Sequence, residues 1–92
     1  MTETSMTALA GEIRMEFQIP PYFKDDGLKN YIREGEAQLL PLVPSADIDT
    51  DFRYRMLLKN YVNYAYYHKV SEWKENYHGM ILEWQLMQEV SV

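Results

Sequence analysis

Residues 51–69 read DFRYRMLLKNYVNYAYYHK, and this stretch decides the fold that we expect. Asp49 and Asp51 can accept hydrogen bonds from the first free N–H groups of a helix, so the stretch begins with an N-cap. Placing its residues at steps of about 100° gathers one apolar arc. This arc consists of Tyr54, Leu57, Leu58, Tyr61, Val62, Tyr64 and Ala65. The stretch therefore predicts a long amphipathic helix with one face in the core.

The opposite face of the same helix is not purely polar. Phe52, Met56, Tyr66 and Tyr67 lie there, interleaved with arginine, lysine and asparagine. Aromatic residues and methionine are enriched in the buried centres of protein interfaces. We therefore predict that Phe52, Met56, Tyr66 and Tyr67 form a subunit interface. The alternative interpretation is that these tyrosines belong to a tyrosine-rich core.

A further helix is predicted over residues 72–88, with Ser71 as its N-cap. It carries two apolar stripes on roughly opposite sides, and a domain of this size can hardly bury both. The first stripe has heptad-like spacing, typical of packing against another helix, and consists of Trp73, Tyr77, Met80, Trp84 and Met87. The second consists of Leu82, Leu86 and Val90, beside Gly79. We expect the first stripe to face the core.

Another helix is predicted over residues 26–40, after the acidic pair Asp25-Asp26, which suits a helix N-terminus. Its apolar stripe consists of Leu28, Ile32, Gly35 and Leu39. Glycine inside a helix costs about 1 kcal/mol. The close approach of a neighbouring helix would explain Gly35, and a merely tolerated glycine is the alternative. Pro41 and Pro44 end the helix and open a loop.

The N-terminal part of the chain is ambiguous. Residues 1–6 are polar and show no period, so we expect a flexible tail. Leu9, Ile13 and Phe17 recur at helical spacing, but Ile13, Met15, Phe17 and Ile19 alternate as in a strand. We prefer a short helix, which Pro20-Pro21 ends.

These elements together predict an all-α fold. We expect a compact bundle of three to four helices with one long central helix. Residues 7–92 should form a single helical domain, because a chain of 92 residues suffices for one domain and not for two.

Composition excludes several classes of function. The chain has no cysteine, so it has neither a disulfide framework nor thiolate metal ligands. Fourteen acidic against nine basic residues give a formal net charge of −5, which argues against binding to a phosphate backbone. The first residues lack the basic and apolar regions of a signal peptide, and no apolar run approaches the roughly 20 residues of a membrane span. We expect no membrane association.

Residues with catalytic or metal-binding chemistry are sparse. His68 and His78 lie across an expected helix break and lack the H-E-x-x-H spacing of zinc enzymes. Asp47, Asp49 and Asp51 are spaced like the first ligands of a calcium loop, but the glycine and the final glutamate of that loop are missing. Glycine-rich phosphate loops and nucleophile motifs do not occur. We therefore expect no enzyme activity, no catalytic residue, no cofactor and no bound metal.

Three segments carry a resemblance to a known family. They are DDGLKNYI at 25–32, LLKNYV at 57–62 after the loop with Pro41 and Pro44, and SEWKENY at 71–77. With these segments, the stretch from Ile19 to Glu89 resembles the small helical head–tail connector (adaptor) proteins of tailed bacteriophages. The shared order is an acidic helix start, a long aromatic helix, and an aromatic pair that opens the last helix.

The resemblance implies a structural virion protein that assembles in the host cytoplasm. It implies a homo-oligomeric ring, about twelvefold in the particle. The subunits of such a ring meet through head-to-tail contacts between two different surfaces. Such a ring docks beneath the portal protein, extends the DNA channel and presents a surface to neck or tail completion proteins. DNA passes through the channel without specific binding. The resemblance supplies no catalytic residues.

A second class of function stays open. A small acidic inhibitor or DNA-mimicking protein could bind a basic site on a host enzyme, and the small size and negative charge fit this role. However, DNA mimicry needs acidic residues aligned along one face, whereas here they are scattered or lie at expected helix starts. A small enzyme or metal protein ranks last.

Overall fold

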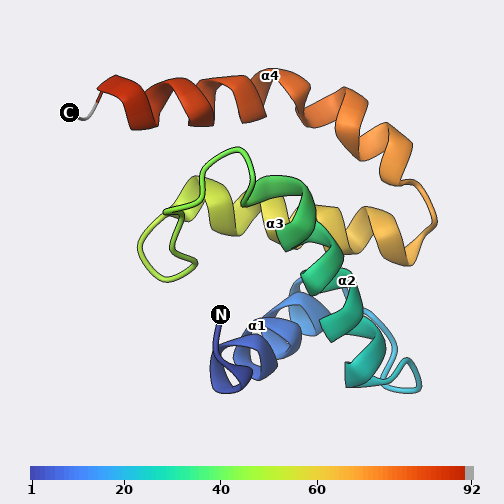
Figure 1. Ribbon diagram of the computed structural model, residues 1–92. Helices are drawn as coiled ribbons and strands as arrows, with labels where there is room; N and C mark the ends of the chain where they lie inside the picture. Colours follow the sequence, from blue (N-terminus) through green and yellow to red (C-terminus); the bar gives the residue numbers. More distant parts are fainter. Residues whose placement is uncertain (91–92) are drawn as a thin grey trace.

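The computed structural model describes residues 1–90, and this part of the chain contains helices and no strand (Figure 1). The all-α class is therefore confirmed. The helices are α1 (Glu3–Glu16), α2 (Asp25–Leu39), α3 (Phe52–Tyr66) and α4 (Val70–Val90). A long central helix is not confirmed, because α3 has 15 residues and the longest helix is α4 with 21.

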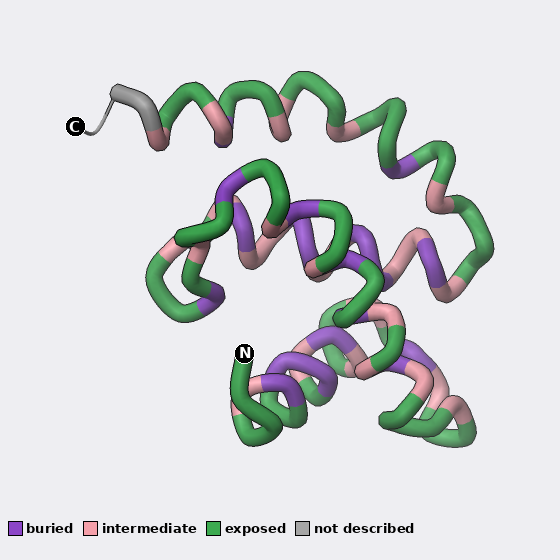
Figure 2. The backbone as a smooth tube through the Cα atoms, in the orientation of Figure 1, coloured by how far each residue is buried: buried purple, intermediate pink, exposed green. Residues whose placement is uncertain are grey.

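Helix α3 lies in the middle of the molecule. In Figure 1, α4 runs antiparallel along one side of α3, α2 crosses in front of α3, and α1 lies on the side away from α4. The buried positions turn toward this centre (Figure 2). All four helices contribute to one hydrophobic core, whose largest fully buried side chains include Trp73, Trp84, Tyr54, Leu9 and Ile13.

The first helix begins earlier than we expected. The side chain of Thr2 accepts a hydrogen bond from the N–H of Ser5 at 3.0 Å, and this N-cap starts α1 at Glu3. Met6 is buried. The expectation of a flexible tail is therefore wrong for residues 3–6, because the cap and the burial of Met6 hold them in the helix.

Two helices end in a left-handed residue that is not glycine. Gln18 after α1 has φ 54° and His68 after α3 has φ 59°. In both motifs the next N–H reaches back to a carbonyl in the last turn: Ile19 to Arg14 at 3.0 Å, and Lys69 to Tyr64 at 2.8 Å. The cap at His68 ends α3 at Tyr66, three residues before the end that we predicted.

The predicted N-caps have mixed outcomes. Asp51 caps α3 as expected, because its side chain accepts from the N–H of Tyr54 at 3.0 Å. Lys24 is the N-cap of α2 without a side-chain hydrogen bond, and Asp25 and Asp26 lie in the first turn. Helix α4 begins at Val70, so Ser71 lies inside the helix instead of capping it.

Of the two apolar stripes of α4, the first faces the core over most of its length and the second is exposed, nearly as predicted. Trp73 and Trp84 are buried, and Tyr77 and Met80 are half-buried against the core. Met87 is 49% exposed, so the first stripe turns away from α3 near its end. Of the second stripe, Leu82 and Leu86 are exposed, and the side chain of Val90 lies outside the described part of the chain.

Gly35 lies where α2 and α3 approach each other most closely. A Cβ atom at this position would overlap Cδ1 of Leu58 and would lie 3.0 Å from Cδ1 of Tyr61. Gly35 and Leu58 are both buried. The structure therefore explains this glycine by close helix packing, as one of our two alternatives proposed.

Gly35→Ala is expected to lower the free energy of unfolding by up to about 2 kcal/mol. Overpacking a core costs about 1–3 kcal/mol, and the better helix propensity of alanine offsets about 1 kcal/mol of it. Gly79→Ala is the matched control, since a Cβ there meets nothing within 4 Å. It should stabilise the protein by about 0.5–1 kcal/mol. Urea unfolding measures both, and equal stabilisation by both substitutions would contradict the close packing at Gly35.

Candidate subunit interface

The four residues predicted as an interface lie at two ends of α3 and not in one patch. Phe52 is 76% exposed and Tyr67 is 57% exposed, whereas Met56 and Tyr66 are half-buried. A helix rises by about 1.5 Å per residue, so about 20 Å separate Phe52 from Tyr66 along the axis. The structure thus keeps Phe52 with Met56 and Tyr66 with Tyr67, as two separate surfaces.

The middle of this face of α3 is held by α1 through ion pairs. Arg55 pairs with Glu12. Nζ of Lys59 lies 3.1 Å from Oε1 of Glu12 and 2.6 Å from Oε2 of Glu16. The side chain of Lys59 is only 14% exposed. Sequence reasoning placed the two cations on this face but not their partners, which are 43 to 47 residues away in the chain.

These ion pairs make the contact between α1 and α3 sensitive to acid. The hydrogen bond from Arg55 lowers the pKa of Glu12, and Lys59 acts in the same direction against the opposing effect of burial. A carboxyl group whose pKa is lower in the folded chain stabilises the fold above its unfolded pKa. That contribution is lost as the pH falls through the folded pKa. The pairing is therefore complete at neutral pH and weakens in acid.

The C-terminal end of α3 carries a cluster of aromatic rings. Tyr66 packs edge-to-face against Phe23 and against Tyr67, with ring centroids 5.0 Å apart in each pair. Phe23 in turn stacks on Tyr31 at 6.0 Å. Tyr22, next to Phe23, is 78% exposed. We call Tyr22, Tyr66 and Tyr67 the tyrosine end of the molecule.

Tyr22 and Phe23 are the residues that sequence reasoning missed at this end. Both follow directly after Pro20-Pro21, in the loop between α1 and α2. The sequence feature that could have indicated them is the pair of adjacent aromatic residues in a short loop that begins with two prolines. Burial raises the pKa of Tyr66, and a hydrogen bond with Tyr22 acts in the same direction. Tyr66 is therefore a neutral hydroxyl at physiological pH.

The N-terminal end of α3 lies beside the end of α4. Phe52, Trp84 and Met87 line one shallow pocket there. Trp84 is fully buried and its indole N–H donates to Oδ2 of Asp51 at 2.8 Å, whereas Phe52 and Met87 stay exposed. We call Phe52, Met56 and Met87 the Phe52 end. An exposed apolar surface therefore flanks each end of α3.

A third apolar surface lies between α4 and the loop after α2. Leu42 is 43% exposed and Leu82 is 46% exposed, and both line one groove with Ile81 and Trp73. The outer stripe of α4 thus has an apolar neighbour in the loop. Sequence reasoning found Leu82 but could not pair it with Leu42.

Residues 1–90 give no sign of a metal centre. His68 and His78 are both exposed, and no three histidine, aspartate or glutamate side chains among residues 1–88, whose side chains the structure describes, are placed to hold a metal ion. In the same range, no helix combines the length and the hydropathy that a bilayer-crossing segment needs.

Comparisons with known proteins give no relative. No protein-family model, curated protein or solved structure matches this chain.

Proposed function

We propose that this chain is a structural subunit of a tailed-phage virion, a head–tail connector or adaptor that works by packing against other subunits. The observation that supports this proposal is the pair of exposed aromatic surfaces at opposite ends of α3. A ring is built from heterologous contacts, in which two different surfaces of one subunit meet its two neighbours. The tyrosine end and the Phe52 end provide two such surfaces. Segments 25–32, 57–62 and 71–77 resemble the head–tail connector proteins, and this resemblance is the reason for proposing a ring in the virion.

In this proposal about twelve copies form a ring beneath the portal protein, and the ring presents a surface to neck or tail completion proteins. The subunit assembles in the host cytoplasm and catalyses no reaction. Its net charge of −5 suits a channel through which DNA slides, because basic walls would bind the phosphates.

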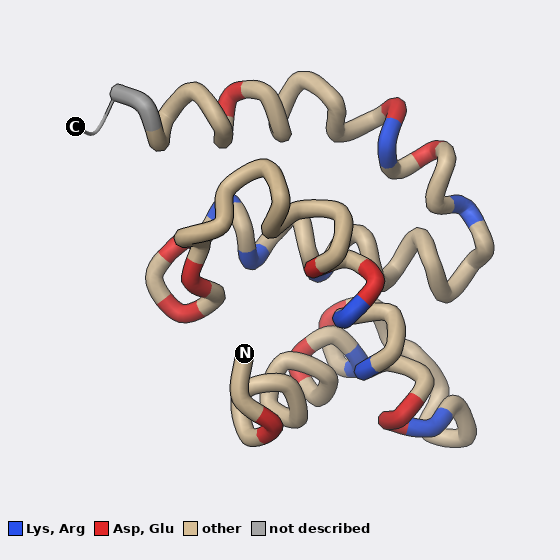
Figure 3. Tube along the Cα trace, viewed as in Figure 1, with Lys and Arg blue, Asp and Glu red and all other residues tan. Residues whose placement is uncertain are grey.

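The acidic inhibitor or DNA mimic has less support. Mimicry needs carboxylates in an unpaired row, as the phosphates of DNA are. Five acidic side chains pair with lysine or arginine of the same chain: Glu3, Glu12, Glu16, Asp25 and Glu83. Acidic positions lie in α1, α2, α4 and the loop before α3, and basic positions lie among them in these three helices (Figure 3).

Tyr67→Ala is expected to weaken assembly and to leave the monomer folded. Truncating an aromatic anchor at the centre of an interface costs about 2 kcal/mol or more, which is a loss of about thirtyfold in affinity. The same change on a surface exposed only to solvent changes stability by no more than about 0.5 kcal/mol. Sedimentation velocity and circular dichroism on one sample, alone and with the portal protein of the same virion, measure assembly and folding together.

Phe52→Ala is the companion variant at the other end, and Met15→Ala is the matched control. Met15 is 83% exposed and belongs to neither end. Tyr66 is unsuitable for this test, because it packs against Phe23 and its truncation would also disturb the fold. If the double variant with Tyr67→Ala and Phe52→Ala assembles like the unchanged protein, the two ends are not subunit contacts.

A further inference from the structure

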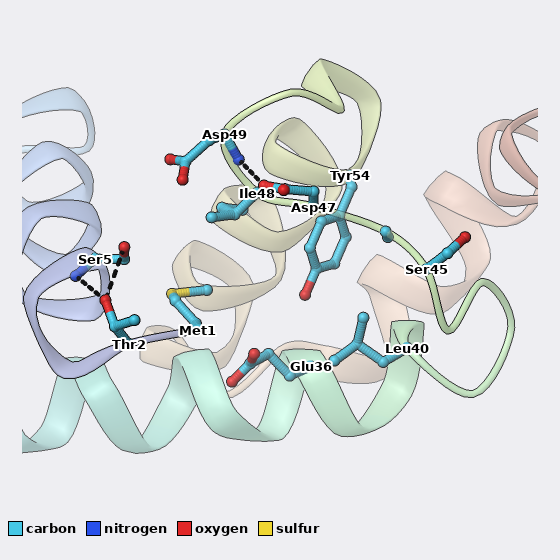
Figure 4. A pocket seen from close by; sticks show the side chains of 11 residues that line it. Met1, Thr2, Ser5, Glu36, Leu40, Ser45, Asp47, Ile48, Asp49 and Tyr54 are labelled. Carbon is cyan, nitrogen blue, oxygen red and sulfur yellow. Dashed lines mark hydrogen bonds between the residues drawn. The ribbon is translucent and has the colours of Figure 1, made fainter.

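An acidic pocket of about 330 Å³ lies between the start of α1, the last turn of α2 and the loop before α3 (Figure 4). The carboxylic acids that line it are Glu36, Asp47 and Asp49. No lysine or arginine lines it. Met1 also lines it, and among the described residues its amino group forms no ion pair. The pocket therefore has an excess of negative charge.

Tyr54 forms the inner wall of this pocket. It is 2% exposed, and its ring stacks on Trp84 with 5.8 Å between the centroids. In Figure 4 the phenol points toward α2, on the side of Glu36 and Leu40. Its hydroxyl has no hydrogen-bond partner in the described part of the chain. The hydroxyl itself opens onto the pocket, since no buried side-chain nitrogen or oxygen in the described part of the chain lacks a partner.

The hydroxyl of Tyr54 is neutral and is available to form a hydrogen bond. Burial raises the pKa of Tyr54 to about 12, and the charges of Glu36 and Asp51 act in the same direction. The phenol can therefore both donate and accept a hydrogen bond. Glu36 is half-buried and forms no ion pair with any described residue. An unpaired carboxylate thus lies beside an unpaired hydroxyl.

An ammonium group fits these acceptors. It has three donors, which carboxylate and phenol oxygens can accept, and charge-assisted hydrogen bonds of this kind are the stronger ones. A metal ion fits less well, since no three acidic or histidine side chains that the structure describes are placed to hold one. The pocket therefore matches the end of a lysine side chain.

Acidic and basic residues are segregated in the sequence on either side of the start of α3. Residues 34–51 contain no lysine or arginine and five acids, namely Glu34, Glu36, Asp47, Asp49 and Asp51. Residues 52–71 contain no acid and four cations, namely Arg53, Arg55, Lys59 and Lys69. The first three of these cations pair with glutamates of the same chain. Lys69 is exposed and has no ion pair with a described residue.

Lys69 cannot reach the pocket of its own subunit. Tyr54 lies in the first turn of α3 and Lys69 follows its last turn, so about 20 Å separate them along the axis. The loop before α3 and the turn after it lie at opposite ends of the molecule (Figures 1 and 3). Only another copy of the chain can therefore bring Lys69 to this pocket.

We propose that the acidic pocket receives the ammonium group of Lys69 from a second copy of this chain. The turn between α3 and α4 of one subunit then docks against the loop between α2 and α3 of the next. Tyr67, two residues before Lys69, adds an exposed aromatic ring to the docking surface. The two surfaces differ, so the contact is heterologous and can continue around a ring. This inference rests on the proposed self-assembly and specifies which surfaces meet.

Cysteine cross-linking tests the contact directly, because the chain has no cysteine of its own. Ser45→Cys places a thiol at the pocket, and Glu72→Cys places one in the first turn of α4, one turn after Lys69. A disulfide needs Cα atoms within about 7 Å, so these two thiols cannot pair within one subunit. The full-length chain with both substitutions should give a ladder of covalent dimers and higher multimers under mild oxidation. Each single-cysteine variant should give no product larger than a covalent dimer, because it can form only one disulfide.

Charge reversal identifies the partner of the pocket. Adding Lys69→Glu to the double-cysteine chain should slow cross-linking about tenfold, because it places like charges in the contact. Lys24→Glu and Lys74→Glu make the same change in net charge at other exposed lysines and should leave the rate unchanged. Mixing a Ser45→Cys chain that carries Glu36→Lys with a Glu72→Cys chain that carries Lys69→Glu should restore cross-linking.

Each outcome decides between the two proposals. The contact is supported if a ladder forms and Lys69→Glu suppresses it while Lys24→Glu and Lys74→Glu do not. If the unchanged protein assembles in the ultracentrifuge but no ladder forms, or if Lys69→Glu leaves the ladder intact, the contact is wrong and the proposed function stands. If neither a ladder nor assembly occurs, alone or with the portal protein, both proposals are overturned.

Discussion

Trp84→Ala is expected to lower the free energy of unfolding by about 3–5 kcal/mol, the range for removing a buried aromatic side chain. Trp84 is fully buried, stacks on Tyr54 and donates its indole N–H to Asp51. Its removal leaves a cavity between α3 and α4 and an unfilled acceptor at the N-cap of α3. A domain of this size has about 5–15 kcal/mol in total, so the loss is a large fraction of its stability. Urea unfolding followed by circular dichroism measures it.

Leu86→Ala is the control on the same helix, because Leu86 is 58% exposed. It should change stability by no more than about 0.5 kcal/mol. Trp84→Phe retains the ring stacking but removes the indole donor, and it provides a measurable variant if the alanine variant fails to fold. A loss below about 1 kcal/mol in Trp84→Ala would mean that the end of α4 is not docked on α3.

The sequence predicted the helices well where a pattern of apolar positions and a polar cap agreed. Asp51 and the arc from Tyr54 to Ala65 gave α3 its start and its buried face, and six of the seven arc positions are buried. The ends of helices were harder. Left-handed caps are usually glycine, and here Gln18 and His68 occupy them, so no glycine marks the residue at which α1 or α3 ends.

The exposed surfaces at the two ends of α3 were predicted only in part, because a helical wheel describes one helix without its neighbours. It correctly placed Phe52 and Tyr67 on an outward face. It could not show that α1 covers the middle of that face through Glu12, or that Phe23 packs on Tyr66. Both contacts join segments distant in the sequence. The same limit hid the acidic pocket, where Glu36 of α2 meets Tyr54 of α3.

The ambiguity in the N-terminal segment has a physical resolution. In a strand, Ile13 and Met15 would point to the same side, because side chains alternate with a period of two. In the helix they lie about 200° apart around the axis. Ile13 is fully buried, whereas Met15 is 83% exposed. Helical spacing is therefore the correct interpretation, and α1 belongs to the core.

Ile13→Ala is expected to lower the free energy of unfolding by about 2–5 kcal/mol, the range for cutting a buried isoleucine to alanine. Ile13 lies in the core between α1 and the rest of the bundle, and the ion pairs of Glu12 and Glu16 hold the helix to α3 on either side of it. Met15→Ala, two residues away, should change stability by no more than about 0.5 kcal/mol. Urea unfolding of the two variants at neutral pH measures the difference. Similar losses in both would indicate an extended segment, and no loss in either would indicate that residues 3–16 detach from the core.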